Sequence, residues 1–138
     1  MSTERRYVFD ANALISALLI PDSVPRKAFD KALTRGEFLL SGAVLAEIES
    51  VLTRPKFQKY LHDDDRIQFL VALVRESSMV SIKESVTDCR DAKDNKYLEL
   101  AYSGRATCLI SGDEDLISLS PFRGIPILTP RQFLDAGE

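Results

Sequence analysis

The sequence has little of the chemistry that histidine and cysteine provide. Among 138 residues there are one histidine, His62, two cysteines, Cys89 and Cys108, and no tryptophan. The cysteines form no CxxC pair and have no neighbouring histidine, so the sequence does not indicate a zinc site. His62 stands in a predicted surface turn, which also disfavours Ser-His-Asp catalysis.

The sequence also lacks long apolar runs and an excess of basic charge. No run approaches the roughly 20 apolar residues that span a bilayer, and the N-terminal segment has no apolar signal core. We therefore expect a cytoplasmic protein without membrane association, in which both thiols are free and Cys108 is a small core residue. The formal net charge of −3 does not favour binding of polyanions unless cations offset it locally.

The apolar content is sufficient for one compact domain. Hydrophobic residues make up 45% of the chain, which contains no repeat or long linker, so we predict a single domain over residues 1–138. Short apolar segments predict strands at 7–10, 38–41, 79–82, 107–111 and 125–128. Helical spacing predicts helices at 13–20, 26–35, 42–54, 56–61, 64–76, 97–103, 116–119 and 130–134. This alternation predicts an α/β fold, a three-layer α/β/α sandwich around a central, mainly parallel sheet.

Acidic residues follow two of the predicted strands. Asp10 ends the first strand, and Asp113 and Asp115 follow the strand that ends at Ser111. In a parallel sheet the carboxyl ends of the strands share one edge, where ligands bind. Asp10 could instead only cap the next helix, since Asp is favoured there, and this stretch alone leaves both interpretations open. Asp94 joins the same edge only if its helix begins there, which the sequence leaves undecided.

Such a cluster of carboxylates is costly without compensation, because like charges raise one another's pKa. Divalent cations relieve the repulsion, and Mg²⁺ and Mn²⁺ prefer oxygen ligands. Acids and a bound metal suffice to hydrolyse a phosphodiester, since the metal lowers the pKa of water and stabilises the leaving oxygen. The acidic run at residues 63–65 needs no such role, because it stands at a predicted helix start, where the helix dipole favours acids.

Four short motifs occur in order along the chain. They are residues 8–12 (Val-Phe-Asp-Ala-Asn), Ser41 with Glu47, residues 91–101 (Asp-Ala-Lys-Asp-Asn-Lys-Tyr-Leu-Glu-Leu-Ala) and residues 110–116 (Ile-Ser-Gly-Asp-Glu-Asp-Leu). Together they resemble the PIN-domain ribonucleases, over about residues 7–134. Residues 45–57 resemble the branch that contains toxins of toxin–antitoxin pairs. The resemblance implies a PIN-like fold and hydrolysis of RNA with Mg²⁺ or Mn²⁺ as cofactor.

The resemblance also implies roles for individual residues. It implies catalysis by four acids, and metal ligation by the same four and one more: Asp10, Glu47, Asp94, Asp113 and, for the metal alone, Asp115. Asn12 and Ser41 would support the acids or a metal-bound water. Asp91 remains open between a helix cap and an outer position in the site.

Partners follow from the same resemblance. Basic residues that could contact RNA phosphates, or could simply be solvated, are Arg54, Lys56, Lys59, Lys93, Lys96 and Arg105. The expected protein partners are an antitoxin and further copies of this chain, in a homodimer or higher oligomer.

Two other functions remain open. A Mg²⁺ phosphatase of the haloacid-dehalogenase type also begins with an acid after a strand, but it needs a second acid two residues later, where this chain has Asn12. A non-catalytic PIN-like module would bind RNA or a protein, and the complete set of acids argues against it. A phospho-aspartate at Asp10 would favour the first alternative, and the absence of specific Mn²⁺ binding would favour the second.

Overall fold

One parallel sheet forms the centre of the structure, a computed structural model that describes residues 5–59 and 61–136. Its strand order is β3-β2-β1-β4-β5, and every neighbouring pair is parallel. The strands are β1 (Arg5–Phe9), β2 (Gly36–Leu40), β3 (Ser77–Met79), β4 (Cys108–Ile110) and β5 (Ile127–Leu128).

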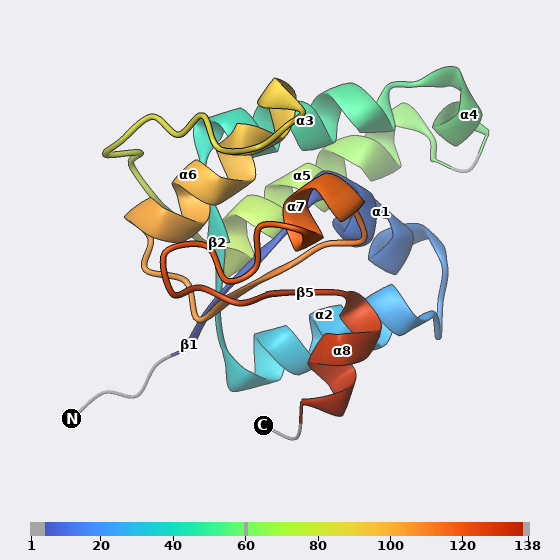
Figure 1. Ribbon diagram of the computed structural model, residues 1–138. Helices are drawn as coiled ribbons and strands as arrows, with labels where there is room; N and C mark the ends of the chain where they lie inside the picture. Colours follow the sequence, from blue (N-terminus) through green and yellow to red (C-terminus); the bar gives the residue numbers. More distant parts are fainter. Residues whose placement is uncertain (1–4, 60, 137–138) are drawn as a thin grey trace.

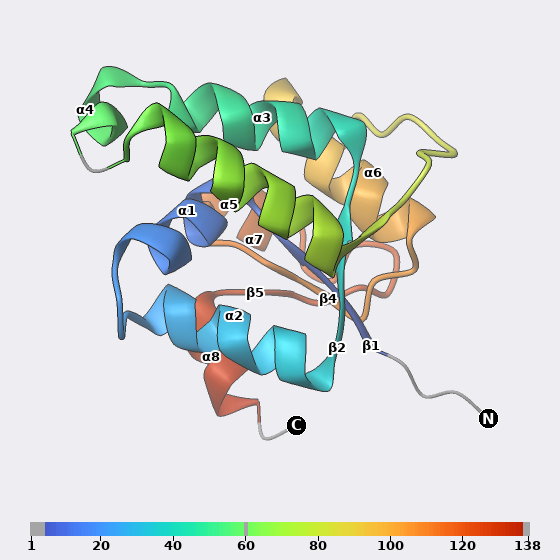
Figure 2. The same cartoon turned by 180° about the vertical axis from the view of Figure 1, so that it is seen from behind.

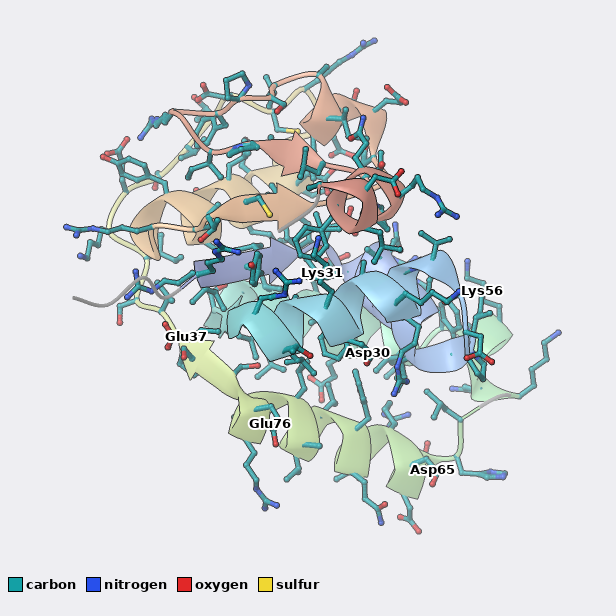
Figure 3. All side chains as sticks on the ribbon, turned by 90° about the horizontal axis from the view of Figure 1, so that it is seen from below. Asp30, Lys31, Glu37, Lys56, Asp65 and Glu76 are labelled. Carbon is teal, nitrogen blue, oxygen red and sulfur yellow. The ribbon has the colours of Figure 1, made fainter. Side chains whose placement is uncertain are left out.

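Helices cover both faces of this sheet. They are α1 (Ala11–Leu19), α2 (Val24–Arg35), α3 (Gly42–Leu52), α4 (Pro55–Gln58), α5 (Asp63–Glu76), the 3-10 helix η1 (Ala92–Asp94), α6 (Asn95–Ser103), α7 (Glu114–Ile117) and α8 (Pro130–Asp135). Helices α3 and α6 lie on one face, and α2 and α8 on the other (Figures 1 and 2). Helix α5 runs beside the edge formed by β3, with Asp65 and Glu76 near its two ends (Figure 3). The predicted three-layer α/β/α fold is confirmed, and the sheet is parallel throughout.

The middle strands are buried on both faces, as their apolar runs predict. Aromatic rings fill the space between the sheet and α2. Phe29 of α2 packs edge-to-face against Phe9 of β1 and Phe38 of β2, with ring centroids 5.7 and 5.4 Å apart. These contacts fix α2 against the two central strands, so the strand ends are held on a rigid core.

The register brings several polar residues to one edge of the sheet. Phe9 lies opposite Ile110, and Leu40 lies opposite Met79. Asp10, Ser41 and Ser111, each of which directly follows a strand, therefore leave the sheet at the same carboxyl edge. This is the edge at which parallel α/β sheets place their ligands.

Most predicted boundaries differ from the structure by one or two residues, and three elements differ for identifiable reasons. The strand predicted at 79–82 is β3 at Ser77–Met79, because pairing with β2 ends there and the following segment turns towards α6, where the Lys83 N–H donates to Ser103 Oγ at 2.9 Å. The last strand shortens to Ile127–Leu128, because the N–H and C=O of Ile125 bond to Phe122 in a tight turn. The helix predicted at 56–61 is α4, Pro55–Gln58, and residue 60 lies outside the described residues.

Neither cysteine forms a disulfide among the described residues, as predicted, and Cys108 packs in the core as expected. Cys89 is buried as well. Within residues 5–59 and 61–136, none of the helices combines the length and apolar character needed to cross a bilayer.

Gly36 is required by the close approach of β1 and β2. A Cβ atom at this position would lie 2.1 Å from the carbonyl oxygen of Arg5, whereas one at Gly42 would meet no atom within 4 Å.

We predict that Gly36→Ala lowers the free energy of unfolding by about 2 kcal/mol or more, because the strands must separate to admit the methyl group. Gly42→Ala, the control, should leave it unchanged or slightly higher. Urea unfolding of both variants measures the difference, and equal midpoints would contradict this account of the β1–β2 contact.

Candidate active site

Asp10 is held at the carboxyl end of the central strand by contacts on both carboxylate oxygens. Its Oδ1 accepts from the Ala13 N–H at 2.8 Å and so caps α1, while its Oδ2 accepts from the hydroxyl of Ser111. Its backbone N–H continues the ladder to the carbonyl oxygen of Ile110 at 3.1 Å. The side chain is 5% exposed and also lines a cavity at this edge. Asp10 is thus a helix cap and a cavity acid at once.

Asp113 reaches the same cavity from the loop after β4. Its N–H donates to Ser111 Oγ at 3.0 Å, so one hydroxyl contacts both Asp10 and Asp113. Its Oδ1 accepts from the Asp115 N–H at 2.9 Å and caps α7. Asp115 itself is not among the residues that line the cavity, so the structure places it beside the acids.

Asp94 lies in the cavity because of the direction of α6. The chain leaves β3 at the carboxyl edge and returns through α6 to enter β4, a parallel neighbour of β1, so α6 begins at that edge. Asp94 immediately precedes α6. Asp91 also lines the cavity, and its side chain caps η1 by accepting from the Lys93 N–H at 3.3 Å. The sequence left open whether this helix begins at the carboxyl edge of the sheet, and the structure shows that it does.

Glu47 projects into the cavity from α3, where it is paired with a lysine. Lys96 Nζ of α6 lies 3.1 Å from Glu47 Oε1. Ser41, at the start of α3, is buried and its hydroxyl accepts from the Val44 N–H at 3.2 Å. Ser41 therefore caps α3 and is not among the residues that line the cavity.

The cavity at this edge has a volume of about 180 Å³ and is lined mainly by charged side chains. The acids are Asp10, Glu47, Asp91, Asp94 and Asp113, and the bases are Arg54 and Lys93. Asn12, exposed to solvent, and Tyr97 complete its polar lining.

The remaining predicted RNA contacts are dispersed. Lys56 lines a separate cavity of about 500 Å³ with Phe57 and residues of α1, and Figure 3 shows it at the α1–α4 end of the molecule. Lys59 and Arg105 are exposed and line neither cavity. Lys96 contacts Glu47 instead of standing free on the surface.

Burial and like charge raise the pKa of the acids at the centre. Burial raises the pKa of Asp10, although the Ser111 hydroxyl and the Ala13 N–H oppose the shift, and the charge of Asp113 adds to it. Asp94 has its pKa raised to about 6, chiefly by burial and then by Asp113, which hydrogen-bonds to the neutral form and repels the charged one. Burial also raises the pKa of Tyr97, with added repulsion from Asp10 and Glu47.

The donor chemistry of the cavity fits a hard divalent cation. Asp94 Oδ2 is buried and accepts no hydrogen bond from any described residue, which is costly for an oxygen atom unless a cation occupies the space beside it. All the candidate ligands are carboxylates, which suit Mg²⁺ or Mn²⁺. However, no three His, Cys, Asp or Glu side chains in the described ranges are already arranged to hold a metal ion. Glu47 Oε1 is engaged by Lys96, so a cation that binds this oxygen would have to displace the ammonium group.

Two residues of this site, Ser111 and Tyr97, were not predicted from the sequence. Ser111 is fully buried and joins Asp10 to Asp113. Tyr97 lines the cavity, and its hydroxyl oxygen accepts from the Ala11 N–H at 3.1 Å, which ties α6 to the start of α1. A polar residue directly after a buried strand is a signal that could have identified Ser111, whereas Tyr97 reads simply as an apolar position of its helix.

The protein is thus an all-parallel α/β sandwich that gathers acids from separate elements in one cavity at the carboxyl edge of its sheet. The sequence matches the PIN domain family over residues 6–115, so the chain belongs to the PIN domain family. It is similar to the uncharacterized protein MJ1680 of Methanocaldococcus jannaschii, with 33% identity over 145 residues, covering 96% of this chain and 92% of that protein.

Solved structures share the fold at low sequence identity. One is the crystal structure of VapBC2 from Rickettsia felis bound to a promoter DNA fragment. A chain of that structure superposes with a TM-score of 0.62 and 12% identity, covering 88% of this chain and 96% of that chain. PAE2754 from Pyrobaculum aerophilum superposes with a TM-score of 0.62 and 12% identity, covering 98% of this chain and 91% of that chain. The predicted family and the fold class are thus confirmed.

The Ser111 hydroxyl contacts both Asp10 and Asp113, so its removal should lower the stability of the fold. We predict that Ser111→Ala lowers the free energy of unfolding by about 1–2 kcal/mol, because Asp10 Oδ2 and the Asp113 N–H both lose a buried partner. Ser118→Ala, which removes an exposed hydroxyl bonded to the Asp115 carbonyl oxygen, serves as the control and should change it little. Urea unfolding compares them, and a neutral Ser111→Ala would refute the linking role.

Asp94 should make the metal-free protein less stable as pH rises. Its folded pKa of about 6 exceeds the ordinary 3.8, so the protonated form favours the fold below about pH 4, and this contribution is lost as pH rises through 6. We predict that Asp94→Asn raises the free energy of unfolding at pH 7 by on the order of 1 kcal/mol, after discounting for partial exposure. Unfolding in chelator at pH 4, 6 and 7 measures this. Asp65→Asn, at an exposed position of α5 that does not line the cavity, should change little, and a loss of stability at pH 7 in Asp94→Asn would contradict the prediction.

Proposed function

We propose that this protein is a metal-dependent endoribonuclease that hydrolyses RNA phosphodiester bonds. The observation that carries the proposal is the meeting of Asp10, Glu47, Asp94 and Asp113 in one cavity, in a chain of the PIN domain family. These acids come from β1, α3, the start of α6 and the loop after β4. Their concentration at one edge has a stability cost, as the raised pKa values of Asp10 and Asp94 indicate, and a catalytic role accounts for that cost.

Asp10, Asp94 and Asp113 would hold the principal Mg²⁺ or Mn²⁺. When bound, such a cation activates water and stabilises the leaving oxygen of the phosphodiester. Support for this assignment comes from the buried Asp94 Oδ2, which has no hydrogen-bond donor among the described residues. Glu47 would ligate the same cation or position the attacking water. Asp115 lies beside the cavity and would act on the cation only through its charge.

The other residues of the cavity orient these acids and the substrate. Ser111 donates to Asp10 and so fixes the direction in which the second carboxylate oxygen points. Arg54 and Lys93 line the same cavity and would contact the phosphates on either side of the scissile bond. Asn12, exposed at the cavity wall, would hydrogen-bond to water or substrate. The acids would thus hold the cation and the bases would hold the RNA backbone.

We further propose that this ribonuclease is the toxin of a toxin–antitoxin pair. The resemblance of residues 45–57 to that branch of the family and the fold shared with VapBC2 support this role. Its partners would be an antitoxin that covers the acidic cavity and a second copy of the chain, and its location the cytoplasm.

Substitution of Asp10 tests the catalytic assignment. We predict that Asp10→Asn lowers Mg²⁺-dependent cleavage of RNA by about 10³-fold or more, because the central ligand loses its charge while its cap to α1 can be kept by the amide oxygen. Cleavage of a fluorescent single-stranded RNA, with and without chelator, measures the loss.

Asp65→Asn is the matched control, because Asp65 is exposed at the start of α5 (Figure 3) and does not line the cavity. It should cleave as the wild type does. Circular dichroism confirms that both variants are folded. Undiminished cleavage by folded Asp10→Asn would reject the proposed site.

A further inference from the structure

Lys96 forms a close ion pair with Glu47, one of the acids proposed to ligate the metal. Its Nζ lies 3.1 Å from Glu47 Oε1, and the two side chains are 21% and 28% exposed. Lys96 stands in the first turn of α6 and Glu47 in the middle of α3, so the ion pair joins two helices on the same face of the sheet. Being partly buried, the pair is screened less by solvent and salt than an exposed surface pair.

Glu47 nevertheless belongs to the acidic cavity. It lines that cavity, and its charge raises the pKa of Tyr97 together with the charges of Asp10 and Asp94. The ammonium group of Lys96 therefore neutralises one acid of a shared cluster. By contrast, Asp94 Oδ2 accepts no hydrogen bond from the described residues and faces no competitor of this kind.

We propose that Lys96 is an internal counter-ion that competes with a divalent cation for Glu47. The inference rests on the proposed function, in that the cation is Mg²⁺ or Mn²⁺ at the acidic cavity. A carboxylate oxygen engaged by an ammonium group is not free to ligate a metal, and the ammonium charge repels the incoming cation. Lys96 lowers the affinity for the metal and stabilises the cluster until the metal binds.

Lys93 offers a matched control for the charge alone. It lines the cavity, but its side chain is 72% exposed and its Nζ is 3.9 Å from Asp91 Oδ2, so it engages no metal-ligating acid closely. Removing Lys93 or Lys96 takes one positive charge from the same region. Only the removal of Lys96 releases Glu47.

Calorimetric titration of the full chain with Mn²⁺, after chelator treatment, tests this competition. We predict that Lys96→Gln binds Mn²⁺ about tenfold more tightly than the wild type, since the metal no longer displaces an ammonium group. Lys93→Gln should gain only about twofold, from the loss of a distant, screened charge. Lys96→Arg, which keeps the charge and the pair, should bind with the wild-type affinity, and thermal unfolding establishes that each variant is folded.

A double-mutant cycle locates the effect at Glu47. In the Glu47→Gln background, Lys96→Gln should gain no more affinity than Lys93→Gln does, because no carboxylate remains to be released. An undiminished tenfold gain in that background would overturn the inference, as would equal or weaker Mn²⁺ binding by Lys96→Gln than by the wild type. Either result would leave the metal-dependent nuclease standing, whereas no Mn²⁺ binding by any variant would overturn both.

Discussion

The mutual repulsion of carboxylates at one edge of the sheet is the constraint on which this structure depends. The parallel arrangement delivers Asp10 and Asp113 to the same edge, and the crossover that returns the chain to β4 adds Asp94. Brought together with Glu47, these acids raise the free energy of the fold unless hydrogen bonds or cations compensate. The Ser111 hydroxyl and the Lys96 ammonium supply part of that compensation from within the chain.

Helix starts supply another part. Asp10 caps α1, Asp91 caps η1 and Asp113 caps α7, so three cavity acids accept hydrogen bonds from backbone N–H groups that would otherwise lack a partner. Capping and cavity lining are therefore compatible functions of the same side chain. A carboxylate with one oxygen on a helix start is fixed in direction, and its second oxygen is left for another contact. The question of cap or ligand that the sequence raises for Asp10 is thus not an exclusive choice.

The sequence predicted most of the fold because strand and helix periods are local properties. It also predicted that Asp10 and Asp113 share an edge, since Asp10 stands at the end of one parallel strand and Asp113 in the short loop after its neighbour. What it could not predict depends on contacts between distant segments. The pairing of Lys96 with Glu47 spans α6 and α3, and the end of β3 at Met79 is set by its register with β2. Asp115 follows Asp113 by only two residues, yet it lies within α7 and does not line the cavity, whereas Asp113 caps that helix and does.

The loss of folding stability caused by the Asp94 carboxylate bears on why this position holds an aspartate. Its Oδ2 is buried without a hydrogen-bond donor among the described residues, and its pKa is raised to about 6, so at neutral pH the folded chain holds a charge that it stabilises poorly. Asparagine would fit the same space, keep the hydrogen bond towards Asp113 and remove the repulsion. A residue that opposes stability in this way persists when its charge is needed for something outside the fold. A divalent cation bound there would offset each of these costs, and Glu47, whose Oε1 is paired with Lys96, is the acid at which the chain itself would compete with that cation.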